Sequence, residues 1–124
     1  MINERMKKFE KFGNELPFAK VYYREDWDCI YFDVHGKQFG LMSKEASQEA
    51  FITLKGNPEV NEILRETSED IIPGYYANKK HWNSIFLKTT DITDEEIEKM
   101  IENSYQLVWE KFPARVRKEL LASQ

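Results

Sequence analysis

The sequence predicts an α+β fold, in which an antiparallel sheet of about five strands has helices packed on it. Apolar residues recur every three to four positions near both ends of the chain, which is typical of amphipathic helices. Between these segments, short runs of β-branched and aromatic residues alternate with turn residues, as in a meander of antiparallel strands. The length of 124 residues fits one domain, so we expect a single domain over residues 1–124.

The first half of the chain predicts one helix and four strands. A helix is expected over residues 1–13, because Ile2, Met6 and Phe9 fall on one face. Gly36 can adopt the positive φ that a tight hairpin between the second and third strands requires. The four strands are expected at residues 19–23, 29–34, 39–42 and 50–55.

The second half predicts three helices and one more strand. Asn57 is a good N-cap and Pro58 suits the first helical position, so a short helix should follow. Thr93 and Glu96 form a capping box at the start of the longest helix, which Pro113 should end. The last strand is expected at 84–87 and a short basic helix at 115–122. The apolar face of the short helix would carry Val60, Ile63 and Leu64, and the buried stripe of the longest would carry Ile97, Met100, Ile101, Ser104, Tyr105, Val108 and Phe112.

The composition describes an acidic protein with an uneven charge. The net charge of -4 argues against a general polyanion binder, yet residues 73–90 contain three lysines and no acid. The single cysteine, Cys29, excludes an internal disulfide framework and suits a reducing compartment. No run approaches the ~20 apolar residues that span a bilayer, and the charged N-terminus has no secretory apolar segment. We therefore expect a cytoplasmic protein with no membrane partner.

The most informative stretch, residues 73–83, reads PGYYANKKHWN and contains no acid. Lysines there can hold phosphate or carboxylate, the rings can stack, and the asparagines offer paired donors and acceptors. The same residues could instead brace the fold, with the tryptophan in the core and the asparagines bonded to nearby backbone. The candidate binding residues are Tyr75, Tyr76, Asn78, Lys79, Lys80, His81, Trp82 and Asn83, together with Lys37 of the hairpin.

Sequence motifs for catalysis and metal binding are absent. The chain has no phosphate-binding glycine loop, no HExxH, no CxxC and no GxSxG. Two histidines and one cysteine spread over the chain make a metal site improbable. We expect no enzyme activity, no catalytic residue, no metal and no cofactor.

The stretch PGYYANKKHWN resembles the signature PGY-x-x-NKKHWN of the MmcQ/YjbR-like family of small bacterial proteins. AFITLKGNPE resembles the family passage I-x-L-K-x-x-P-E, and residues 101–108 resemble its I-x-x-S-Y-x-L-V helix. The hairpin VHGKQF resembles its V-G-G-K-x-F hairpin, with His35 where glycine is usual. Tyr76 and Ala77 stand where many members carry histidine and methionine, so an activity that uses that histidine is in doubt here.

This resemblance implies an α+β fold similar to that of type III secretion chaperones, with hairpins described as a double wing, and it implies DNA binding. Our first hypothesis is weak electrostatic binding of DNA through the 73–83 loop, because few phosphate contacts are available. The alternative is an adaptor that binds a small molecule or a peptide and uses the same loop as a pocket wall, with Lys79 or Lys80 holding an anion. The sequence does not indicate an oligomeric state.

Overall fold

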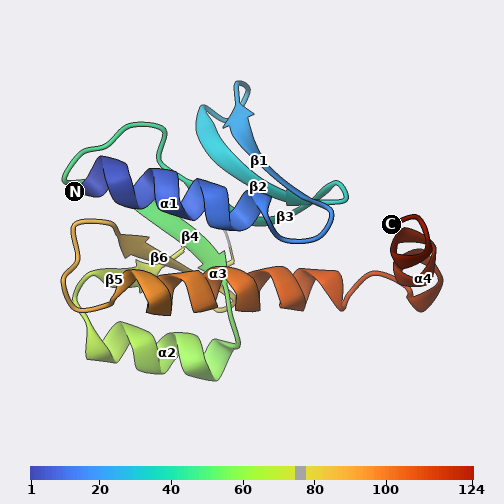
Figure 1. The fold of residues 1–124 in the computed structure, drawn as a ribbon. Coiled ribbons are helices and arrows are strands. Elements are labelled where there is room, and N and C mark those ends of the chain that lie inside the picture. Colours follow the sequence, from blue (N-terminus) through green and yellow to red (C-terminus); the bar gives the residue numbers. More distant parts are fainter. Residues whose placement is uncertain (75–77) are drawn as a thin grey trace.

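The tertiary structure is a computed structural model that describes residues 1–74 and 78–124. A six-stranded antiparallel sheet runs in the order β1-β2-β3-β4-β6-β5. Helices α1, α3 and α2 lie side by side against the sheet, and α4 lies beyond the end of α3 (Figure 1). The strands are β1 (Ala19–Arg24), β2 (Cys29–Val34), β3 (Lys37–Met42), β4 (Phe51–Lys55), β5 (Ile71–Pro73) and β6 (Trp82–Phe86). The helices are α1 (Ile2–Asn14), α2 (Pro58–Thr67), α3 (Asp94–Trp109) and α4 (Ala114–Ala122).

The predicted α+β class and antiparallel sheet are confirmed, but the sheet has six strands where about five were expected. The missed strand, β5, has only three residues and ends in a proline, so it is too short to show a periodic pattern. β6 begins at Trp82 rather than at the predicted residue 84. The segment 73–83 therefore starts in β5 and ends in β6, which pair with each other as neighbouring strands.

The core lies between the sheet and the helices α1 and α3, and the predicted stripe of α3 is confirmed. Ile97, Ile101, Tyr105 and Val108 are buried, and Met100 packs against them. The capping box of Thr93 and Glu96 also forms as expected. The central core residues of the other elements are Phe9, Phe32, Val34, Phe39, Met42, Ile52, Leu54, Ile71, Ile85 and Leu87.

The expected apolar face of α2 is wrong for Val60 and Ile63, whereas Leu64 packs against the core as expected. Val60 and Ile63 are 51% and 58% exposed, whereas the polar Asn61 is only 3% exposed. α2 packs against the edge strand β5 and its neighbour β6 rather than over the middle of the sheet. The side of α2 that faces the protein therefore meets backbone polar groups of a connecting segment, which a polar side chain can satisfy.

The hairpin between β2 and β3 turns through two residues with positive φ, His35 at 47° and Gly36 at 86°. Two such residues form the mirror-image turn that suits a two-residue hairpin, which explains why glycine fits the position of His35. Asp33 Oδ1 accepts a 2.7 Å hydrogen bond from the Gly36 amide. The His35 ring lies 5.7 Å from the Phe112 ring, so the tip of the hairpin is docked at the C-terminal end of α3.

Candidate anion-binding site

The connection between β5 and β6 is fixed by its own backbone in the part that the structure describes. The amides of His81 and Trp82 donate to the Asn78 carbonyl, and the Lys80 amide donates to Asn78 Oδ1. The Gly74 amide donates to the Trp82 carbonyl over 2.7 Å. A Cβ on Gly74 would lie 2.7 Å from the Cβ of Trp82, so the close neighbour that requires glycine is the partner strand rather than a ligand.

Helix α2 clamps the same segment from the side. Asn61 Nδ2 donates to the carbonyls of Gly56 and Lys80, and Arg65 donates to the Lys79 carbonyl and, over 2.7 Å, to Asn83 Oδ1. Asn83 Nδ2 in turn donates to the Asn61 carbonyl. Asn83 is 1% exposed, so its amide holds the segment to α2. Burial and internal hydrogen bonds engage both polar atoms of the Asn83 side chain, which favours the bracing alternative over ligand contact at this position.

The hydrogen bonds of the two lysines to this clamp involve only their backbone carbonyls. Lys79 and Lys80 are exposed, and neither forms an ion pair within the described residues. His81 and Trp82 are half-buried at the same end of β6. Tyr75 and Tyr76 lie outside the described residues. The described part of the segment thus presents two ammonium groups on a backbone that is held in place.

Next to this segment lies a pocket lined by a second group of lysines, which we call the lysine pocket. It has a volume of about 340 Å³. Lys55 ends β4, where it pairs with Trp82 of β6, and the Gly56 amide donates to the His81 carbonyl. The pocket and the segment therefore share one end of the sheet. The lining residues are Lys37, Gln38, Lys55, Val108, Lys111 and Phe112.

The electrostatics of the lysine pocket are unusual for a protein surface. Burial, followed by the neighbouring charge of Lys111, lowers the pKa of Lys55 from 10.5 to about 8. No carboxylate contributes to this shift. An uncompensated positive site of this kind favours an anion, because an incoming negative charge relieves the repulsion between the two ammonium groups.

Sequence reasoning identified Lys37 in this pocket but missed Lys55 and Lys111. These positions are far apart in the chain and belong to no common motif. The only sequence signal near Lys55 was the passage AFITLKGNPE, which predicted a strand followed by a helix rather than a binding residue. The antiparallel pairing of β3 with β4 and the packing of α3 over both strands bring the three lysines together.

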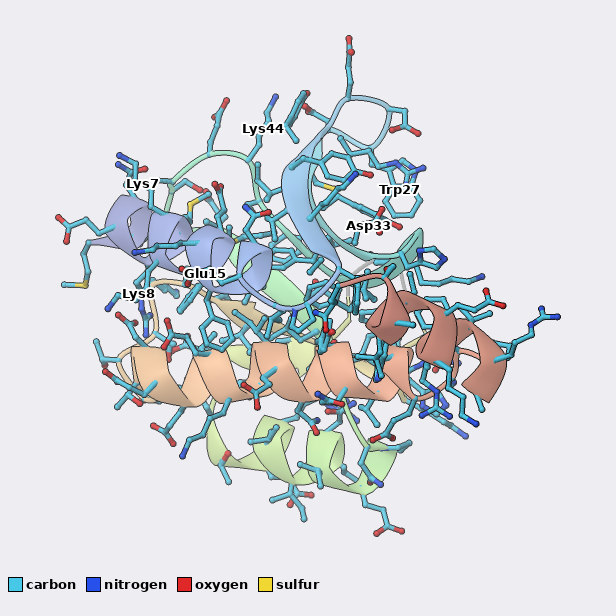
Figure 2. All side chains as sticks on the ribbon, turned by 45° about the vertical axis from the view of Figure 1, so that its right-hand side comes forward. Lys7, Lys8, Glu15, Trp27, Asp33 and Lys44 are labelled. Atoms are coloured by element: carbon cyan, nitrogen blue, oxygen red, sulfur yellow. The ribbon has the colours of Figure 1, made fainter. Side chains whose placement is uncertain are left out.

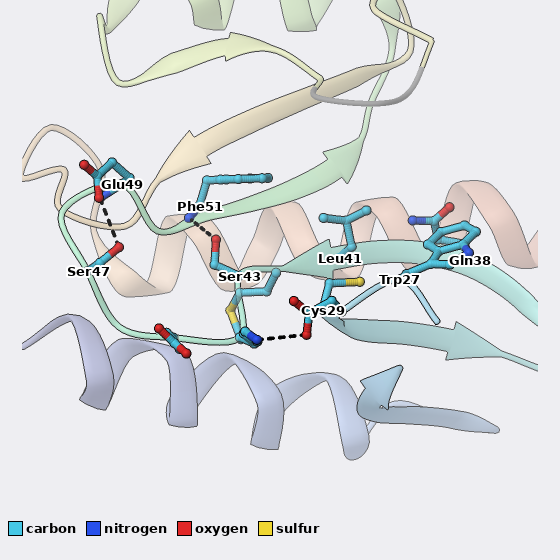
Figure 3. A pocket seen from close by; sticks show the side chains of 12 residues that line it. Trp27, Cys29, Gln38, Leu41, Ser43, Ser47, Glu49 and Phe51 are labelled. Atoms are coloured by element: carbon cyan, nitrogen blue, oxygen red, sulfur yellow. Dashed lines mark hydrogen bonds and ion pairs between the residues drawn. The ribbon is translucent and has the colours of Figure 1, made fainter. Parts of the chain in front are cut away.

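The largest groove, about 740 Å³, lies elsewhere, between the β1–β2 turn and the loop that joins β3 to β4 (Figure 3). Trp27, Leu41 and Phe51 contribute to its largely apolar wall. Cys29 also lines it, is 8% exposed, and has a pKa raised by burial, so it is a buried side chain of the wall. None of the residues 78–83 lines this groove.

A smaller groove of about 360 Å³ lies between α2 and α3, beside the end of β4. Of the described residues in the 73–83 segment, only Asn83 contributes to its wall. The hypothesis that the loop lysines form a pocket wall therefore finds no support among the described residues. The concave cationic site at this end of the sheet is the lysine pocket. Lys37, one of the candidate binding residues from the sequence, lines it.

Among residues 1–74 and 78–124, no three side chains of the histidine, cysteine or acidic type gather as they would around a metal ion. None of the helices described there has the length and apolar character needed to cross a bilayer.

Comparison with known proteins places this site in a family. Residues 15–107 match the YjbR family, and this span includes the described part of the clamped segment, Lys37 and Lys55. The chain belongs to the YjbR family. The predicted resemblance is thereby confirmed, and Lys111 lies just beyond the matched span.

Several relatives support this family assignment. The chain is 30% identical over 105 residues to the Escherichia coli K12 protein named uncharacterized protein YjbR, covering 85% of this chain and 87% of that protein. It is 45% identical over 99 residues to the Bacillus subtilis protein named uncharacterized protein YyaQ, covering 80% of each. These names assign no activity.

Solved structures of similar proteins confirm the fold. A Deinococcus radiodurans crystal structure matches with a TM-score of 0.83 at 29% identity, covering 93% of this chain and 86% of that one. A Pseudomonas syringae crystal structure matches with a TM-score of 0.67 at 25% identity, covering 82% of this chain and 96% of that one.

Proposed function

We propose that this YjbR-family protein binds DNA through electrostatic contacts of Lys79 and Lys80, assisted by Lys37. The observation that carries the proposal is the exposure of Lys79 and Lys80 without an ion-pair partner in the described part of the chain, although the protein is acidic overall. Exposed lysines without an ion-pair partner suit phosphate contacts, because each contact releases counterions condensed on the nucleic acid.

The fixed backbone of the segment supports a binding role. The carbonyls of Lys79 and Lys80 accept hydrogen bonds from Arg65 and Asn61 of α2. A ligand that meets these lysines would order only the side chains, because the main chain is already held, and less conformational entropy is lost. The arrangement contains a surface for contact rather than an assembled nucleophile and base, so we propose binding without catalysis.

The proposed binding is weak and sensitive to salt. The net charge of -4 opposes the approach of a duplex, and a handful of lysines can neutralise few phosphates. A cytoplasmic location, where the protein would meet bacterial DNA, is part of the same proposal.

Fluorescence anisotropy with a short random-sequence duplex tests the proposal. Affinity of the unmodified protein is expected to fall steeply as salt is raised, and the Lys79→Ala/Lys80→Ala variant should reduce the slope of log affinity against log salt by about 2. The matched control is Lys7→Ala/Lys11→Ala, which removes two exposed lysines of α1 and changes the net charge equally. Absence of binding at low salt, or equal losses in both double variants, would overturn the proposal.

A further inference from the structure

Three lysines from three separate elements converge at the C-terminal end of α3. Lys37 begins β3, Lys55 ends β4, and Lys111 follows α3. They line one pocket of about 340 Å³ together with Gln38, Val108 and Phe112. None of these six lining residues is acidic.

Two other lysines of the protein are each paired with a carboxylate. Lys8 pairs with Asp94 and Lys44 pairs with Asp28, each over 2.9 Å. In contrast, Lys55 has Lys111 as its charged neighbour, and burial together with that neighbour lowers the pKa of Lys55 to about 8. The carbonyl end of α3 offers roughly half a negative charge, which is too little to balance three ammonium groups.

The pocket is held in shape by contacts that do not involve the ammonium groups. The Lys55 amide donates to Ser104 Oγ over 2.9 Å, and Ser104 Oγ donates to the Phe39 carbonyl, which fixes β4 and β3 to α3. The contact of His35 with Phe112 fixes the hairpin tip near the same helix end. These contacts set the backbone around Lys37 and Lys55, so a ligand would have to order only the lysine side chains.

We propose that the lysine pocket binds the phosphate group of an anionic ligand, with Lys55 and Lys111 as its central donors and Lys37 and Gln38 beside them. Lysine binds phosphate as a compact charge with three donors, and a dianion offsets most of the charge of three ammonium groups. Val108 and Phe112 supply an apolar wall for the carbon part of a phosphorylated molecule. This inference does not rest on DNA binding by Lys79 and Lys80.

Binding should be linked to protonation. Since an anion favours the charged form of Lys55, occupancy is expected to raise the pKa of Lys55 from about 8 toward its ordinary value of 10.5. Lys37 and Lys111 are the other titratable groups that line the pocket, and both are cationic, so neither supplies the missing negative charge.

A nuclear magnetic resonance titration tests the inference. Protein with isotope-labelled lysine side chains is titrated with inorganic phosphate, and with sodium chloride at matched ionic strength. Saturable shifts of the lysine signals of the pocket are expected with phosphate alone, together with a rise in the pKa of Lys55. Lys55→Gln and Lys111→Gln should each weaken phosphate binding by about tenfold.

Lys111→Gln keeps the test decisive even if Lys55→Gln misfolds. Lys111 is exposed, so Lys111→Gln preserves the buried structure even if Lys55→Gln disturbs it. Lys99→Gln, an exposed lysine of α3 that does not line the lysine pocket, is the matched control and should leave binding unchanged. Phosphate shifts no larger than those of chloride, or equal binding by Lys111→Gln and the unmodified protein, would overturn the inference.

Two further titrations, one with glycerol phosphate and one with duplex DNA, distinguish which kind of molecule supplies the phosphate group. Glycerol phosphate that shifts the pocket signals at lower concentration than duplex DNA assigns the site to a small phosphorylated molecule. The reverse order assigns it to the nucleic-acid backbone, and both results support a phosphate site. A protein that binds phosphate but no DNA refutes only the function proposed for Lys79 and Lys80, so the two proposals fail separately.

Discussion

The two ends of helix α3 differ in whether the cationic side chains near them are paired with a carboxylate. At the N-terminal end, Asp94 accepts hydrogen bonds from Arg5 over 2.6 Å and from Lys8 over 2.9 Å. Figure 2 labels Lys8 near this end of the helix, whereas Lys7 lies on another side of α1. At the C-terminal end, Lys55 and Lys111 face each other with no carboxylate beside Lys55. The cationic side chains at the N-terminal end are therefore paired with Asp94, whereas Lys55 at the C-terminal end has no carboxylate beside it.

This difference separates a structural use of charge from a binding use. Arg5 is 8% exposed and also donates to the backbone carbonyls of Leu87, Thr89 and Ile92, so its guanidinium ties α1 to the loop before α3. A buried charge that is fully bonded in this way holds the fold together. The lysine pocket lacks such partners, and an external anion would supply the missing charge.

The largest expected effect is at the neutralised end. Arg5→Leu leaves three carbonyls without their donor and leaves Asp94 with Lys8 alone, and should lower the free energy of unfolding by about 4 kcal/mol. Chemical denaturation measures this loss. Lys8→Met is the control: the side chain of Lys8 is 50% exposed, so this variant should change the free energy of unfolding only slightly. Equal losses in the two variants would contradict the contrast between a buried and an exposed partner of Asp94.

A smaller effect is expected where α2 clamps the binding segment. Asn61→Ala removes two donated hydrogen bonds, to Gly56 and Lys80, from a buried site and should cost about 2 kcal/mol of stability. It should also weaken DNA binding without changing any charge, because Lys80 loses its fixed backbone. Denaturation and anisotropy measure the two effects, with the exposed Asn103→Ala as control. Unchanged DNA affinity in a destabilised Asn61→Ala protein would show that the clamp does not serve binding.

The smallest expected effect is a gain in the free energy of unfolding rather than a loss, and it concerns Lys55. Because the pKa of Lys55 is lower in the folded protein than the usual 10.5, its charged form opposes folding below about pH 8. This contribution to stability should improve as pH rises from about 8 toward 10.5. Lys55→Gln should therefore stabilise the protein at neutral pH by about 1 kcal/mol, after allowance for screening by solvent.

Thermal and chemical denaturation over this pH range check the expectation, with the unmodified protein gaining relative to Lys55→Gln as pH rises. A variant that is less stable than the unmodified protein at neutral pH would show that Lys55 has a compensating partner, and would weaken the case for an anion site.

The sequence determined the local elements and the family. The N-cap at Asn57, the capping box at Thr93 and the apolar stripe of α3 all formed as predicted, because each depends on residues within one or two helical turns. The signature around Lys79 and Lys80 identified the YjbR family from a continuous stretch.

Only the tertiary structure decided which polar residues hold the fold and which face a ligand. Asn83 became part of a clamp because α2 placed Asn61 and Arg65 beside it. Lys55 and Lys111 became neighbours because α3 packs across the end of β4. Such contacts depend on strand order and helix packing between distant segments, and no local pattern of residues records them.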